Sequence, residues 1–300
     1  MKTDSKAMVL ASFAADSLAL GAHWIYDTNM IEREIGIVDQ LRSPVADSYH
    51  STKKKGDFTH YGDQSLVLLR HLAENHGFDL HTFASQWQQF SRSYSGYLDG
   101  ATKKTLEAMD AGNSAEDCGS NSSDLGGPAR VAPLIYWYHD DPERLMKFAR
   151  EQTRLTHKGA GVAAATDFIV HAALKVLDGA TPLQAIEALV DDGLADIELD
   201  LRLRTCLETV ADDSREVVAR FGQMCGTSAA LPGAVHLICA YQDNMQEALV
   251  QNVMAGGDSA ARGMVIGMIL GAYQGLDGLD QNWLKEMRAT ETILTYLDKA

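Results

Sequence analysis

Apolar residues recur at intervals of three and four along most of this chain, and this spacing constrains the fold more than any other feature of the sequence. Side chains three and four positions apart lie on one face of an α-helix, so such a stripe marks the side that packs into a core. Alternating β-branched residues bounded by turn dipeptides, the pattern of a β-strand, are nearly absent. The sequence therefore predicts an all-α protein. The two clearest stripes are Leu66, Leu69, Leu72 and Ala73, and Val162, Ala165, Ile169, Ala172 and Val176.

The helical pattern continues through all 300 residues without a feature typical of a domain boundary. No Pro-, Ser- or charge-rich linker divides the chain, and no repeat of fixed period occurs. We therefore expect a single domain over residues 1–300. The weakest patterning, over residues 42–58 and 112–128, predicts two loops. The first loop carries three successive lysines, Lys53 to Lys55; such a run is more often a solvated surface than a binding site, although binding residues tend to collect in long loops.

Four glycines near the C-terminus, Gly263, Gly267, Gly271 and Gly275, occur at regular four-residue intervals. In a helix they would lie on one face and expose bare backbone there. Each glycine lowers the stability of a helix by about 0.5 to 1 kcal/mol relative to alanine, so a compensating contact is expected. We predict that a second helix packs unusually closely against this face.

The charge balance of the chain excludes several classes of partner. With 41 acidic and 26 basic residues the formal charge is -15, which repels nucleic-acid phosphates and anionic membranes. Small molecules or other proteins are the expected partners. The longest uncharged apolar block in the last third, residues 263–273, falls well short of the ~20 residues that a membrane span requires. The four cysteines lack zinc-ligand spacing and the N-terminus does not resemble a signal peptide, so we expect a cytoplasmic protein with reduced thiols.

Asp16 lies inside an expected helix, residues 9–20, in which nearly every neighbour is apolar or small. Its carboxylate is therefore expected to be buried. Burial of an unpaired charge is unfavourable, so the group must be hydrogen-bonded, ion-paired or bound to a ligand or metal. A structural aspartate that accepts backbone hydrogen bonds and a functional one are both consistent with this position.

Two further aspartates, Asp63 and Asp258, each precede an expected helix and follow a glycine. Either could be only an N-cap, because an aspartate at that position accepts hydrogen bonds from free N–H groups and contributes about 1 kcal/mol. The adjacent glycines let the backbone come close to a ligand, which favours a functional interpretation. Oxygen ligands at helix starts would suit a hard cation such as magnesium.

A dense polar and aromatic cluster, His23-Trp24-Ile25-Tyr26-Asp27, follows the first expected helix. Aromatic rings stack on sugars or nucleobases, and a histidine can act as acid or base near neutral pH; the same residues can also simply close a helix end. Arg130 follows Gly126-Gly127-Pro128-Ala129. Its planar guanidinium could hold a phosphate, or it could form an ion pair with one of the many carboxylates.

Five segments, taken in order along the chain, resemble the ADP-ribosylglycohydrolase family, whose all-helical members remove ADP-ribose from modified side chains. The resemblance covers almost the whole sequence and implies a compact orthogonal helical bundle. The segments are Ala15-Asp16-Ser17-Leu18 with Gly21, Gly62-Asp63, Arg130-Val131-Ala132-Pro133-Leu134, Leu155-Thr156-His157 and Gly256-Gly257-Asp258.

Members of this family hold two magnesium ions with a Thr-Asp-Asp-Thr motif and a Gly-Gly-Asp-x-Asp-Thr or -Ser motif, and this chain departs from both. The first motif aligns with Tyr61-Gly62-Asp63-Gln64, which lacks one carboxylate and both threonines. In the second, Ala260 and Ala261 replace the second aspartate and the hydroxyl residue. The resemblance therefore implies at most one magnesium ion, with Asp63 and Asp258 as ligands. The His-Trp-Ile-Tyr-Asp and Tyr-Gly-Asp-Gln segments are most similar to the branch that includes selenoprotein J and the J-type crystallins.

The resemblance implies a hydrolase that cleaves an ADP-ribosyl or related N- or O-glycosidic bond in a central cleft. Its expected partner is an ADP-ribose-like small molecule or an ADP-ribosylated protein. Two alternatives stay open: a non-catalytic binding or structural protein of the same fold, and a hydrolase with a metal-independent site. The predicted catalytic residues are Asp16 and Asp63, the predicted metal ligands are Asp63 and Asp258, and the predicted ligand-binding residues are His23, Trp24, Tyr61, Gly62, Arg130, His157 and Gly257.

Overall fold

The computed structural model describes residues 4–300, and within them the fold is all-α, as predicted. Isolated bridges join Ser120 to His157 and Asp124 to Gly226, and these residues form no sheet. No helix in this part of the chain has the length and apolar character that crossing a bilayer demands. The α-helices are α1 (Ser5–Ala19), α2 (Thr28–Met30), α3 (His60–Asn75), α4 (Leu80–Ser93), α5 (Gly100–Asp110), α6 (Ala132–Tyr138), α7 (Pro142–Arg154), α8 (Val162–Leu177), α9 (Pro182–Asp192), α10 (Ile197–Leu207), α11 (Ser214–Phe221), α12 (Thr227–Ala240), α13 (Met245–Met254), α14 (Ser259–Gln274), α15 (Gln281–Glu286) and α16 (Thr290–Leu297). Short helices of other types are η1 (Ile31–Ile35), η2 (Pro128–Arg130) and η3 (Leu276–Gly278).

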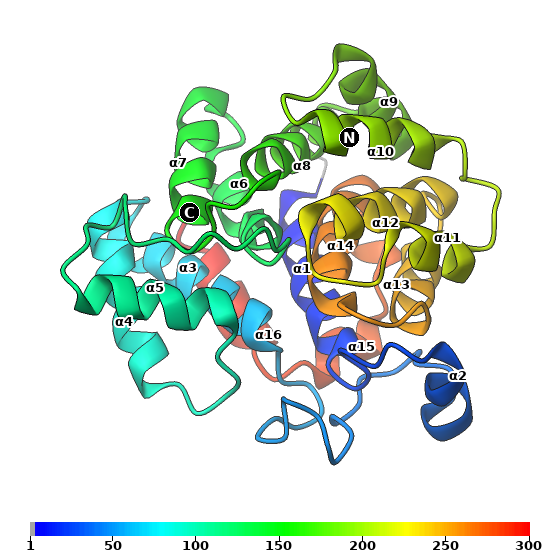
Figure 1. Ribbon diagram of the computed structural model, residues 1–300, viewed down its shortest axis with the longest axis horizontal. Helices are drawn as coiled ribbons and strands as arrows, with labels where there is room; N and C mark the ends of the chain where they lie inside the picture. The colour runs from blue at the N-terminus through cyan, green and yellow to red at the C-terminus, as the bar shows by residue number, and fades with distance from the viewer. Residues whose placement is uncertain (1–3) are drawn as a thin grey trace.

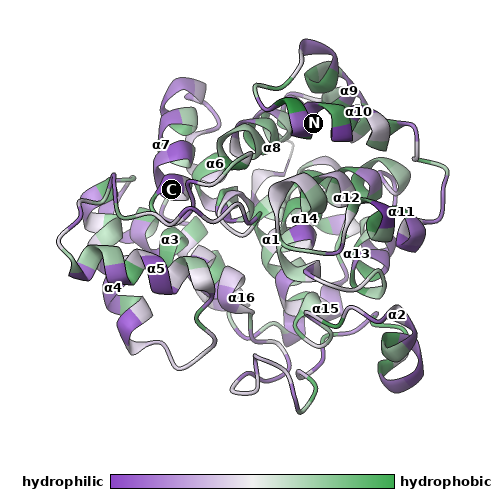
Figure 2. Ribbon diagram, in the orientation of Figure 1, coloured by the Kyte–Doolittle hydropathy of each residue, from purple (hydrophilic) through white to green (hydrophobic). Residues whose placement is uncertain are grey.

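Two helices from opposite ends of the chain, α1 and α14, pack side by side at the centre of the molecule (Figure 1). Every residue from Ala7 to Ala19 and from Ser259 to Ala272 is buried. Apolar and small residues lie on all sides of both helices, which is the pattern of helices that are enclosed by others. Figure 2 shows hydrophobic colouring at this centre and the most hydrophilic segments on the outer helices.

The predicted close packing against the glycine face of α14 is confirmed for three of the four glycines. A Cβ atom added at Gly271 would lie 2.7 Å from Ala11 Cβ and 2.8 Å from the Ala7 carbonyl oxygen, both on α1. One added at Gly267 would overlap the Ala11 carbonyl, and one at Gly263 would lie 3.5 Å from Ala15. The prediction is wrong for the fourth glycine, because Gly275 ends α14 with φ +68° and is not part of this face.

The other helices surround this central pair. Helices α12 and α13 pack against α14, and α10 and α11 pack against α12. Helix α8 also contacts α14 and packs against α7 and α9. Helices α3 and α6 pack against α1, and helices α4 and α16 pack against α3. This arrangement brings the start of α3 close to α1 and to the segment that precedes α14.

Both predicted apolar stripes and both predicted loops are present. The stripe residues lie on α3 and α8 and are buried, except that Leu66 is only partly buried. Residues 36–59 and 111–127 hold no helix. One helix start was predicted wrongly: α3 begins at His60 and not at Gln64, because the Thr59 side chain accepts a hydrogen bond from Tyr61 N and caps the helix. Asp63 therefore lies within the first turn and is not the N-cap.

Candidate functional site

The first turn of α3 is the place where the predicted aspartates meet. Asp16, from α1, accepts hydrogen bonds from Thr59 N at 2.8 Å and from Thr59 Oγ1 at 2.5 Å. Its side chain is fully buried, as the apolar neighbours predicted. Asp16 thus holds the residue that caps α3 and fixes where this helix begins.

Gly62 allows Asp16 to come so close to α3. A Cβ atom at position 62 would overlap Asp16 Oδ2 and would lie 2.8 Å from Phe58 Cβ. A larger residue would therefore push the carboxylate away from Thr59. Gly62 was predicted to bind ligand; in the structure its neighbour is the buried Asp16.

Asp63, on the same turn, is bonded to a cation and a hydroxyl. Lys53 Nζ and Tyr94 Oη both donate to Asp63 Oδ2. The Asp63 side chain keeps 16% of its surface exposed. Burial raises the pKa of Asp63, although Lys53 opposes this shift. Lys53 of the predicted surface run therefore has a partly buried partner, whereas Lys55 pairs with Glu286 at the exposed surface.

Asp258 is the N-cap of α14, which confirms that interpretation, and it also has a second bond. Its side chain accepts from Ala261 N at 3.3 Å and from Tyr61 Oη at 2.9 Å. It is fully buried, and burial raises its pKa. Tyr61 is the next residue after the start of α3, so the third aspartate is joined to the same turn as the other two.

The segment before α14 also holds the predicted aromatic cluster. The Gly257 carbonyl accepts from Trp24 N at 2.9 Å, and Gly257 N donates to the Ile25 carbonyl at 2.8 Å. Gly257 has φ +70°, a conformation that favours glycine. His23 stacks on Trp24 with ring centroids 4.5 Å apart. The backbone pairing therefore brings this segment next to Asp258, whose Oδ1 lies 3.9 Å from His23 Nδ1.

Burial raises the pKa of all three predicted aspartates, Asp16, Asp63 and Asp258. Burial raises the pKa of Asp16 from 3.8 to about 6. The charge of Asp63 acts in the same direction, whereas the hydrogen bonds from Thr59 lower the pKa. Two neighbouring carboxyl groups with raised pKa values are an arrangement that is common where acid–base chemistry occurs.

Arg130 and His157 meet at Thr156, where Arg130 also contacts Gln64 of α3. Arg130 is almost fully buried and donates from Nη1 to Gln64 Oε1 and from Nη2 to Thr156 Oγ1 at 2.6 Å. His157 Nδ1 lies 2.8 Å from the same Thr156 hydroxyl. Burial lowers the pKa of Arg130 to about 10 and that of His157 to about 3. The hydrogen-bond acceptors of Arg130 among the described residues are neutral, so the structure does not contain the carboxylate ion pair that the sequence left open.

These contacts do not fit the two magnesium ions of the resembled motifs. The position next to Asp63 is taken by the ammonium group of Lys53, and Asp258 is bonded to Tyr61 and to the start of α14. Ala260 and Ala261 are buried and supply no side-chain oxygen. The single ion held by Asp63 and Asp258 stays a prediction, and this arrangement does not favour it.

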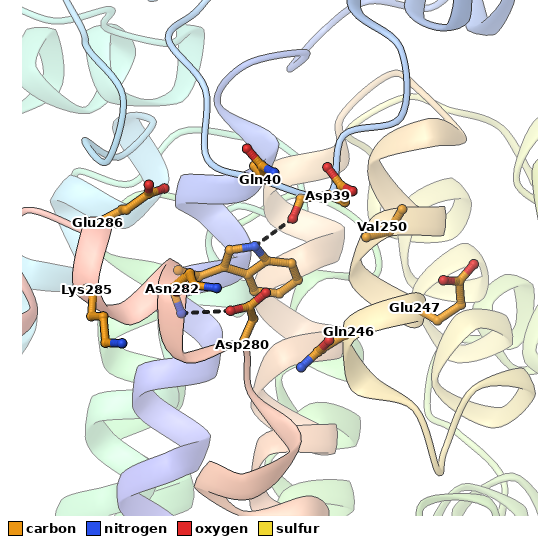
Figure 3. Close-up of a pocket in the computed structure, with 10 residues that line it drawn as sticks. Asp39, Gln40, Gln246, Glu247, Val250, Asp280, Asn282, Lys285 and Glu286 are labelled. Atoms are coloured by element: carbon orange, nitrogen blue, oxygen red, sulfur yellow. Dashed lines mark hydrogen bonds between the residues drawn. The ribbon is translucent and has the colours of Figure 1, made fainter.

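Two of the three predicted aspartates, Asp16 and Asp258, are covered and do not line an open cleft, since they are 0% exposed. Asp63 alone keeps part of its surface exposed. A cavity of about 550 Å³ lies elsewhere, between α13, α15 and residues 39–40 (Figure 3). Asp280 and Glu247 are on its wall, and none of the predicted site residues is. His157 lines another cavity of about 200 Å³ between α7 and α8.

Several residues of this region were missed by the sequence analysis because their only signal is three-dimensional. Each lies in a loop or at a helix end, where apolar periodicity carries no information, and each contacts a residue distant in sequence. They are His50, Thr59, His60, Tyr49, Tyr94, Tyr97 and Asp99.

Comparisons with known proteins identify the family of this chain and agree with its fold. Residues 3–300 match the family model described as ADP-ribosylglycohydrolase. Crystallin J1A of Tripedalia cystophora is 21% identical over 316 residues, covering 99% of this chain and 96% of that protein. ADP-ribosylhydrolase ARH3 of Bos taurus is 26% identical over 204 residues, covering 58% of this chain and 56% of that protein. A solved structure described as an ADP-ribosylglycohydrolase-related protein complex superposes with a TM-score of 0.72 at 21% identity, covering 99% of this chain and 97% of that chain. The chain belongs to the ADP-ribosylglycohydrolase family.

Proposed function

We propose that this protein hydrolyses an ADP-ribosyl or related N- or O-glycosidic bond without the two-magnesium site of the resembled motifs. The observation that carries the proposal is the pair of neighbouring carboxyl groups, Asp16 and Asp63, with raised pKa values at the start of α3. Membership of the family supports a hydrolase of this type. An ADP-ribose-like small molecule or an ADP-ribosylated protein is the substrate that this family favours.

The rings of Trp24, Tyr49 and Tyr97 pack together and form an aromatic cover over buried histidines, which supports binding of a ring-containing ligand. Trp24 packs edge-on against Tyr49 and Tyr97, with centroids 5.3 and 5.1 Å away. Tyr49 is 66% exposed and the other two rings are partly exposed, so this surface is open to solvent. Such rings stack on nucleobases and sugars. Beneath them lie His23 and His60, which pack against Trp24.

The chemistry required is the breaking of the bond between the ribose C1 and the leaving oxygen or nitrogen. Water supplies the oxygen that replaces the leaving group on C1 and gives one proton to a carboxylate base, while one proton passes from an acid to the leaving group. Asp63, the partly exposed carboxyl group, is the proposed acid or base. Asp16 is fully buried, so it acts as a positioning residue through Thr59 and the first turn of α3.

A non-catalytic role of the kind implied by the crystallin relatives is the second candidate. It is favoured by one observation: Asp16, Asp63 and Asp258 each accept hydrogen bonds from groups of the protein itself. A scaffold that no longer binds metal would need these internal bonds to keep its buried carboxylates satisfied.

The two candidates are separated by an assay of ADP-ribose release from ADP-ribosylated protein, with either magnesium or a chelator present. We expect release that is unaffected by the chelator and that falls about 100-fold or more in Asp63→Asn. Asp110→Asn, an exposed aspartate paired with Arg92, is the matched control and should keep full activity. Release only with magnesium would replace the proposal with the metal-dependent mechanism. Absence of both release and thermal stabilisation by ADP-ribose would support the scaffold.

A further inference from the structure

Three histidines from separate segments meet beneath the aromatic cover. His23 follows α1, His50 lies in the loop over residues 36–59, and His60 is the first residue of α3. One ring nitrogen from each lies within 4.8 Å of the others. The side chains are almost fully inside the protein, with exposed fractions of 4%, 0% and 1%.

The ring nitrogens of these histidines are poorly satisfied by the protein. Both nitrogens of His23 and Nδ1 of His50 are buried without a hydrogen-bond partner, while Nε2 of His60 has the Asp99 carboxylate at 3.3 Å. His50 Nε2 and His60 Nδ1 lie 3.2 Å apart and form a hydrogen bond with each other. Leaving one buried polar group without a partner costs about 1–3 kcal/mol, and native structures rarely gather several at one place. The cluster therefore lacks something that the protein chain does not supply.

Two carboxylates stand behind this cluster. Asp99 Oδ2 lies 3.3 Å from His60 Nε2, and Asp258 Oδ1 lies 3.9 Å from His23 Nδ1. Asp99 is itself fixed as the N-cap of α5, where it accepts from Thr102 N at 2.5 Å. A carboxylate on the far nitrogen of an imidazole is the usual support of a histidine that binds a metal, and Asp99 is close enough to give it to His60. Asp258 is too far from His23 for a hydrogen bond and contributes only its charge.

We propose that His23, His50 and His60 form a binding site for one divalent transition-metal ion of the zinc type. Nitrogen ligands at about 2.0–2.1 Å from zinc in a tetrahedral site lie about 3.4 Å apart, close to the 3.2 Å between His50 and His60. Magnesium prefers oxygen ligands and does not suit three imidazoles. The two carboxylates behind the rings balance part of the charge of the ion.

Coordination uses the free lone pair of a neutral imidazole, so each of the three histidines offers one ring nitrogen to the ion. The proposed site does not include Asp63, so it does not depend on the hydrolase mechanism proposed above.

Equilibrium dialysis of the whole protein against zinc and cobalt, after removal of metal with a chelator, tests the site. We expect one equivalent of zinc per chain in the presence of excess magnesium, and visible d–d absorption bands when cobalt is bound. His50→Gln should weaken zinc binding about 100-fold or more, and Asp99→Asn about 10- to 100-fold. His71→Gln is the matched control, because His71 is also buried and bonds to Gln86 outside the cluster; its zinc affinity should equal that of the wild type.

Two results with the wild-type protein and one with a variant would each overturn the proposal. Zinc binding that is absent, that is displaced by magnesium, or that is as strong in His50→Gln as in the wild type contradicts the site. If His50→Gln does not fold, as judged by circular dichroism, the zinc affinity of Asp99→Asn tests the site. In that variant the three histidines are unchanged and only the carboxylate beside His60 is replaced; zinc affinity equal to that of the wild type would then contradict the site. A protein that binds zinc and releases no ADP-ribose would reject the proposed hydrolase and keep the metal site.

Discussion

The buried carboxyl group of Asp16 constrains several residues around it. It fixes Thr59, needs a glycine at position 62, and lies next to Asp63. The burial of Asp16 followed from its apolar neighbours in the sequence. Its partner did not, because Thr59 is 43 residues away and nothing in a linear pattern joins the two.

The pH dependence of stability should report this burial. The pKa of Asp16 is raised to about 6 in the folded protein from 3.8, so the folded state binds the proton more tightly between these values. Stability should therefore rise as the pH falls from about 7 to about 4, and the gain is complete below the unfolded pKa. We expect wild type to gain about 2 kcal/mol relative to Asp16→Asn between pH 7 and pH 4, and about 3 kcal/mol in total once the pH is well below 3.8, from about 1.4 kcal/mol per pKa unit.

Urea denaturation of both proteins at each pH measures this difference, and the comparison removes contributions from other groups. The charges that face Asp16 are those of Asp63, which raises its pKa, and His60, which lowers it; both remain in the variant. Asp298→Asn, at an exposed ion pair with Lys6, is the control and should show the wild-type profile. Parallel profiles for wild type and Asp16→Asn would show that Asp16 does not titrate in this range.

At the scale of helices, the sequence predicted what depends on spacing within one element. The stripes of α3 and α8 and the glycine face of α14 were correct because three- and four-residue periods place side chains on a helix face whatever surrounds it. The start of α3 was wrong, since several polar residues precede the helix and only the Thr59 contact selects the cap. The prediction for Gly275 was wrong because α14 ends there, although the four-residue spacing from Gly271 would also fit a helix that continues.

The contact between α1 and α14 gives a prediction at this scale. Gly267→Ala adds a methyl group where it would overlap the Ala11 carbonyl, so the helices must separate. We expect a loss of about 1–3 kcal/mol in the free energy of unfolding, despite the better helix propensity of alanine. Gly100→Ala, at the start of α5, has no heavy atom within 4 Å of the added methyl group and should lose nothing. Equal stability of the two variants in denaturation experiments would contradict the close packing.

At the scale of the whole molecule, the fold class and family were predictable, whereas the histidine cluster was not. Periodicity and the order of five segments are properties of the linear sequence. The meeting of His23, His50 and His60 depends on a helix end, a long loop and a helix start that come together only after folding. Metal-ligand spacing within one segment, the signal that a sequence can show, is absent there.

The path of the chain predicts that the molecule unfolds as one unit. Helix α1, from the first residues, packs along α14, and α16, from the last residues, packs on α3. Neither half can bury its central helix alone, so we expect one calorimetric transition whose van't Hoff enthalpy equals the measured enthalpy. Gly267→Ala should move the whole transition to lower temperature, because its contact joins both ends of the chain. Two resolved transitions, with only one shifted by the variant, would contradict the prediction of a single domain and would mean that some outer helices form a separate unit.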